Sequence, residues 1–236
     1  MSSRVVLRLV RKDWWLMRWP VAAYITAALA GLAGAVWGSQ AGRAAGISLE
    51  LNVLIAVSFH VMLGGVLGER ERKTLAFLMS LPATPSDAAL AKVIGAFSLF
   101  LAPATIAATA LVWLSPMDIP AAMAASHASF WSHAAGTLGY YGLVLGAWLM
   151  FFAVVLGAGI VSESVGWTIG VLTGLLFIAG NFVLQVMPNL HGVGRYLRAL
   201  ARGEAALPVT IACEAAAIAA IVAAVLIMQR RKTSFV

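Results

Sequence analysis

Six long apolar segments dominate the 236-residue chain and determine which folds are open to it. A transmembrane helix needs about 20 mostly apolar residues in a row to cross the hydrocarbon core of a bilayer. The segments that approach or exceed this length are 20–38, 51–68, 88–114, 137–161, 167–187 and 208–228. They are continuous and lack the apolar/polar alternation of barrel strands, so the sequence predicts an all-α bundle of six transmembrane helices.

The rest of the chain is too short to form a separate soluble domain. Only 11% of the residues are charged and the mean hydropathy is +0.94, whereas roughly a quarter of an average soluble domain is charged. We therefore expect residues 1–236 to form one membrane domain. The single cysteine, Cys213, lies inside the sixth segment, which excludes a disulfide framework within the chain.

The distribution of basic residues predicts the orientation, because Lys and Arg near span ends concentrate on the cytoplasmic side. With both termini inside, twelve Lys and Arg lie in the cytoplasm and four lie outside. We expect a multi-pass protein of the bacterial cytoplasmic (inner) membrane with both ends in the cytoplasm. The net charge of +7 then reflects topology and contact with anionic membrane lipid, and no nucleic-acid partner is expected.

Residues 1–19 predict an amphipathic interfacial helix ahead of the first span. At about 100° per residue, the basic residues from Arg4 to Arg18 fall on one side and the aliphatic residues on the other. The tryptophans of this segment suit the headgroup boundary. The favoured interpretation is an anchor that sets the entry angle of the first span, and the alternative is a lipid-specific binding site.

A few polar side chains lie inside the apolar segments, where each has to face protein or water. The candidates for a translocation route are His60, Asn181, Gln185 and Glu214. In that interpretation they line the route, or His60 and Glu214 titrate during transport. In the other, each makes an interhelical hydrogen bond that holds the bundle together. Glu50 and Lys92 lie near segment ends, where Lys92 can reach the membrane surface. No metal site is predicted.

Motifs for nucleotide binding and hydrolysis are absent from the sequence. There is no G-x-x-x-x-G-K-[ST] phosphate-binding loop, no G-x-S-x-G and no H-E-x-x-H. We therefore expect no catalytic residue, no cofactor and no enzyme activity in this chain itself. Any transport work has to draw its energy from an ion gradient or from a partner protein.

The loop 69–87, between the second and third spans, is the most distinctive inner segment. It opens with five charged residues, Glu69, Arg70, Glu71, Arg72 and Lys73. Charge alone predicts only a solvated turn. The next eight residues, however, predict about two helical turns, with Leu75, Leu78 and Met79 on one face and Pro82 at the end. A short helix with an exposed apolar stripe suits a groove on another protein.

This loop resembles that of the permease subunits of ABC-2 type transporters, six-helix proteins that work with a separate ATP-hydrolysing subunit. The family pattern is roughly E-x-E-x-G-T-L-E-x-L-x-x-L-P with a downstream G-K. The chain matches it at the acid-basic-acid-basic run and at Thr74, Leu75, Leu78, Leu81, Pro82 and Lys92. It departs from the pattern at Lys73, Ala76 and Ala91.

The resemblance implies a coupling helix that docks on the ATPase, with a smaller second contact at Glu163. The residues it implies at the ATPase are Glu69, Arg70, Glu71, Arg72, Lys73, Thr74, Leu75, Leu78, Met79, Leu81, Pro82 and Glu163. Two ATPase copies, which bind ATP and Mg, and a second identical or similar permease chain are the implied partners. Spans two and five would lie near the central route.

The expected function is therefore ATP-driven export of an amphipathic compound such as a drug, a peptide or a lipid. Two alternatives stay open from the residues. One is an ion-coupled secondary transporter that uses His60 or Glu214 as its proton group. The other is a membrane scaffold that transports nothing, in which the glycine-rich helix faces serve packing alone.

Overall fold

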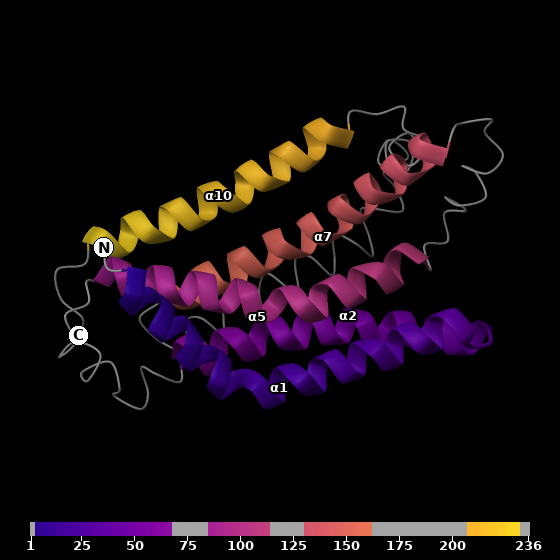
Figure 1. Cartoon of the computed structure of the whole chain (residues 1–236), viewed down its shortest axis with the longest axis horizontal. Helices are drawn as coiled ribbons and strands as arrows, with labels where there is room; N and C mark the ends of the chain where they lie inside the picture. Colours follow the sequence, from indigo (N-terminus) through magenta and orange to yellow (C-terminus); the bar gives the residue numbers. More distant parts are fainter. Residues whose placement is uncertain (1–2, 68–84, 114–129, 162–206, 232–236) are drawn as a thin grey trace.

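The computed structural model describes residues 3–67, 85–113, 130–161 and 207–231, and all its elements within these ranges are helical. The elements are α1 (Ser3–Trp37), α2 (Gln40–Met62), the π-helix η1 (Leu63–Leu67), α5 (Pro85–Trp113), α7 (Phe130–Val161) and α10 (Leu207–Arg231). Figure 1 shows them as an elongated bundle.

Five of these helices are long and apolar enough to cross a membrane. The candidate spans are Arg4–Trp37, Gln40–Gly65, Asp87–Leu111, Tyr141–Val161 and Val209–Gln229. The all-helical class and the multi-pass character expected from the sequence are thus confirmed. The predicted span 167–187 lies outside the described residues.

α1 is continuous through Pro20, so the predicted interfacial segment 1–19 and the first span share one helix. Proline inside a helix removes a backbone hydrogen bond and bends the axis, and Figure 1 shows the N-terminal part of α1 inclined to the remainder. One buried stripe follows the whole helix, through Val6, Asp13, Met17, Val21, Ala28, Gly31 and Ala35. Because this single face packs on the bundle, both parts of α1 keep one helical register.

α1 and α2 form a tight antiparallel hairpin, where the sequence predicted a loop over residues 39–50. Only Gly38 and Ser39 separate the two helices, and the Ser39 hydroxyl accepts a 3.4 Å hydrogen bond from the Gly42 amide as N-cap. Gly46 packs directly on the α1 backbone at Gly31, so a Cβ there would lie 2.6 Å from the Gly31 carbonyl oxygen. This close approach lets α2 start well before the apolar segment does.

α5 is the central helix and packs against α1, α2, α7 and α10. Its phenylalanines build the core with Phe152 of α7. The Phe100 and Phe152 rings stack with centroids 4.3 Å apart, and the Phe97 ring meets Phe152 edge-on at 5.2 Å. Aromatic pairs of this kind add about 0.5–1.5 kcal/mol beyond the area that they bury.

Contacts along the helices fix their relative directions. α7 runs antiparallel to α5. The Tyr141 hydroxyl donates to the Thr105 carbonyl oxygen at 3.2 Å, whereas Phe152, later in α7, contacts Phe100, which is earlier in α5. α10 runs parallel to α7, since Gly142 lies near Ile211 and Gly157 lies near Val225, and Figure 1 also shows this. In that figure α1 and α5 begin, and α2 and α10 end, toward the same end of the bundle.

Candidate functional site

Most of the residues singled out in the sequence lie outside the described part of the chain. This holds for the loop residues 69–82, for Glu163, and for Asn181 and Gln185. Their predicted roles therefore stay predictions. His60 and Glu214 are described, and the structure adds polar contacts that the sequence did not single out.

His60 forms an interhelical contact with Tyr24 of α1. The Tyr24 hydroxyl lies 3.3 Å from His60 Nδ1, and the two rings meet edge-on with centroids 5.7 Å apart. The sequence placed His60 near the middle of its span. Because α2 begins at Gln40, His60 falls instead in the last turn of that helix, just before η1. The contact has the form that the packing interpretation predicts, and a role in transport stays a proposal.

Glu50 lies in the middle of α2, where the sequence analysis had placed His60. It was expected near a segment end, but it is ten residues inside α2 and fully buried against Gly31 of α1. Neither carboxylate oxygen makes a hydrogen bond of normal geometry to the described residues, although the Leu32 backbone lies near enough to interact. A buried carboxyl group without a donor is costly.

Glu214 of α10 repeats this arrangement against α7. Its carboxylate lies directly on Gly146, and its Oε2 is buried without a hydrogen-bond partner among the described residues. In both helix pairs the glycine provides the space that the acid occupies.

Asp13 of α1 and Lys92 of α5 form an ion pair between helices. Lys92 Nζ donates to both carboxylate oxygens at 3.0 and 3.1 Å, and the side chains are only 7% and 16% exposed, respectively. The next residue of α1, Trp14, donates from Nε1 to the Ser98 hydroxyl of α5 at 2.7 Å. The sequence allows Lys92 to reach the membrane surface, and its partner Asp13 lies in the predicted interfacial segment 1–19 of α1.

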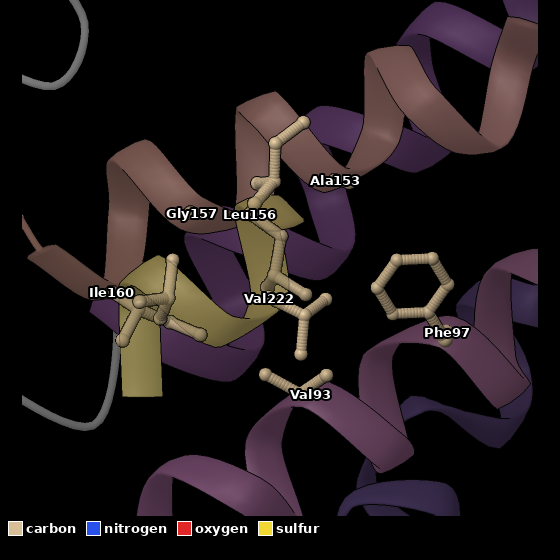
Figure 2. A pocket seen from close by; sticks show the side chains of 9 residues that line it. Val93, Phe97, Ala153, Leu156, Gly157, Ile160 and Val222 are labelled. Atoms are coloured by element: carbon tan, nitrogen blue, oxygen red, sulfur yellow. The ribbon is translucent and has the colours of Figure 1, made fainter. Parts of the chain in front are cut away.

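An apolar recess lies where α5, α7 and α10 meet (Figure 2). Its walls are Val93, Phe97, Ala153, Leu156, Gly157, Ile160, Ile221, Val222 and Val225. Its volume is about 10 Å³, and a cavity needs at least about 10–15 Å³ to hold one water molecule. The recess is therefore a packing gap and not a substrate cavity. Nearby, Gln229 Nε2 donates to the Ile160 carbonyl oxygen at 2.8 Å.

Among the described residues, no group of three or more His, Cys, Asp or Glu could hold a metal ion. No family model, curated protein or solved structure matches the chain. The resemblance to ABC-2 permeases therefore rests on the loop motif and the expected topology.

Two signals in the sequence could have revealed the ion pair. Asp13 is the only acid in the first 49 residues, and Lys92 is the only Lys or Arg between Lys73 and Arg195. A lone acid in a basic segment and a lone base in an apolar one each need a partner of opposite charge. The sequence gives no comparable indication that Tyr24 contacts His60, because tyrosine is common near membrane boundaries.

Proposed function

We propose that the chain is the permease subunit of an ATP-binding cassette transporter that exports an amphipathic compound. The observation that carries the proposal is the loop 69–82, with its charged start and its Leu75, Leu78 and Met79 stripe. A separate subunit would bind ATP and Mg and would dock on this loop. Two such subunits and a second permease chain would complete the transporter.

The position of this loop between α2 and α5 supports the proposal. η1 ends at Leu67 and α5 begins at Pro85, toward the end of the bundle where α1 begins and α10 ends. The positive-inside count assigns that end to the cytoplasm, where an ATPase would be found. α5 follows the loop directly and packs on the other four long helices. A displacement of the loop would therefore be transmitted through α5 to the other four long helices.

The connection between α7 and α10 supports six crossings. The two helices lie side by side and run in the same direction. In our proposal the chain between Val161 and Leu207 crosses the membrane once more. The apolar segment 167–187 is long enough for this, since about 20 helical residues span a bilayer. Six crossings with both termini on one side is the topology that the resemblance implies.

The test of the proposal is docking of the ATPase encoded beside this chain. Leu75→Asp together with Leu78→Asp should abolish its co-purification with the permease while the membrane domain still folds. Ala41→Asp with Ala45→Asp is the matched control, because both alanines are exposed in α2 toward the opposite end of the bundle. Survival of the complex in the leucine variant would contradict the proposal.

The buried carboxylates favour a second candidate, an ion-coupled secondary transporter. Glu50 is fully buried and Glu214 is half-buried, each against a glycine of the neighbouring helix, and intramembrane acids often mark ion or proton pathways. Transport by proteoliposomes separates the two candidates. Dependence on ATP that persists in Glu214→Gln would support the permease. Transport driven by an ion gradient without any ATPase, and lost in Glu214→Gln, would support the second candidate.

A further inference from the structure

The N-terminal part of α1 presents an exposed face of arginine and tryptophan. Its members are Arg4, Arg8, Arg11, Trp15, Arg18 and Trp19, and we name them the arginine-tryptophan face. Their spacing of three to four residues places them on one side of the helix. Trp15 is 63% and Trp19 72% exposed. The Arg18 guanidinium carbon lies 4.9 Å from the Trp15 ring and 5.5 Å from the Trp19 ring.

The opposite side of the same helix is fixed to the bundle. Val6 and Met17 are buried, and Asp13 between them pairs with Lys92 of α5. The hydrogen bond from Trp14 to Ser98 adds a second attachment. These contacts prevent the helix from rolling about its axis. The arginine-tryptophan face is therefore held outward, away from α5.

The charge of this face is of one sign. Asp13 is the only acid in the first 49 residues, and it lies on the buried side of the helix. The planar guanidinium group of arginine matches the oxygens of a phosphate and binds them in pairs. A phosphate ester is therefore the ligand chemistry that four arginines at this spacing fit.

The location of the arginine-tryptophan face indicates which class of phosphate ester it contacts. Trp19 directly precedes the apolar run of α1 that begins at Pro20. Exposed tryptophans next to a spanning segment lie at the boundary between headgroups and hydrocarbon. The arginines continue from this boundary along the inclined start of the helix (Figure 1).

We propose that the arginine-tryptophan face binds the headgroups of anionic phospholipids at the membrane surface. The arginines contact the phosphates, and Trp15 and Trp19 lie against the upper part of the acyl chains. The Asp13–Lys92 ion pair determines which side of the helix the lipid meets. This inference stands independently of the transport mechanism, because it uses only contacts within α1 and between α1 and α5.

The test compares two lipids on the full chain in a nonionic detergent. An equimolar mixture of phosphatidylglycerol and phosphatidylcholine is added, and native mass spectrometry measures the ratio of the two bound lipids. Arg8→Gln with Arg11→Gln should lower the preference for phosphatidylglycerol about fivefold for each arginine, the equivalent of ~1 kcal/mol per basic residue near an anionic surface. Arg8→Lys with Arg11→Lys should retain most of the preference.

Arg11→Gln and Arg43→Gln form the matched pair of single variants. Arg43 is an exposed helical arginine at the hairpin end of α2, away from the face. We expect the preference to fall in Arg11→Gln and to stay at the wild-type level in Arg43→Gln. An equal fall in both would overturn the proposal, because the preference would then follow net charge. An unchanged lipid preference in the double Gln variant would also overturn it.

Discussion

At the scale of single residues, two glycines provide the space that Glu50 and Glu214 occupy between helices. Gly31 faces Glu50 across the α1–α2 contact, and Gly146 faces Glu214 across the α7–α10 contact. In each pair the missing side chain of glycine leaves room for a carboxyl group between two helices. A side chain added at either glycine would therefore displace the carboxyl group that packs against it.

Gly31→Ala should lower the free energy of unfolding. The added Cβ would lie 2.7 Å from Glu50 Oε1, and overpacking of this kind costs about 1–3 kcal/mol. Unfolding in mixed detergent micelles measures the change. Gly65→Ala is the control, because a Cβ at Gly65 meets no atom within 4 Å. Adding Glu50→Ala should recover most of the loss, and failure to recover it would show that the carboxylate is not the obstacle.

The Asp13–Lys92 ion pair should show strong coupling in a double-mutant cycle. Asp13→Leu alone leaves the Lys92 charge partly buried without its main partner, and removal of one member of a buried pair costs about 3–5 kcal/mol. Lys92→Met alone should act likewise. The double variant should be more stable than either single variant, since it leaves neither charge behind. Strictly additive losses would mean that the two side chains do not depend on each other.

The sequence predicted individual polar residues more reliably than their partners. His60 and Glu214 were identified because a polar group in an apolar run is visible at once. Glu50 was overlooked as an interior group because its depth depends on where α2 begins, and close packing of glycines in the hairpin decides that. Tyr24 was overlooked because its contact with His60 joins two helices whose register the sequence does not contain.

At the scale of elements, hydropathy predicted the apolar spans but not the full length of the helices. A span ends where polar residues begin, whereas a helix ends where its backbone hydrogen bonds find no further partner. α1 therefore continues through the predicted interfacial segment, and α2 begins at Gln40, ahead of the apolar segment that starts at Leu51. Both extensions are stabilised by contacts between helices, which periodicity within one segment cannot reveal.

The parallel packing of α7 and α10 predicts a specific pattern of cross-links. A Cβ at Gly142 would lie 3.4 Å from the Ile211 side chain, and one at Gly157 would lie 3.1 Å from the Val225 side chain. In a Cys213→Ser background, cysteines at 142 and 211, and at 157 and 225, should cross-link on oxidation. Cysteines at 142 and 225 should not, and gel electrophoresis separates the products. Efficient cross-linking of that last pair would mean that the helices run antiparallel.

At the scale of the whole molecule, helix directions constrain the topology beyond the described residues. Four of the five helices alternate in direction along the chain, and α10 then repeats the direction of α7. Two consecutive described helices can share a direction only if the chain between them returns. If each described helix crosses the membrane, the apolar segment 167–187 is long enough to supply the further crossing that we propose between Val161 and Leu207.

Accessibility of single cysteines in whole cells tests this return directly. In a Cys213→Ser background, Ser39→Cys at the hairpin and Ala205→Cys before α10 should react with a membrane-impermeant maleimide added outside. Ser162→Cys after α7 should react only once the cells are opened, since α7 runs away from the hairpin end. Labelling of Ser162→Cys and Ala205→Cys from the same side would remove the crossing between them. The helix directions and the six-span topology would then both be wrong.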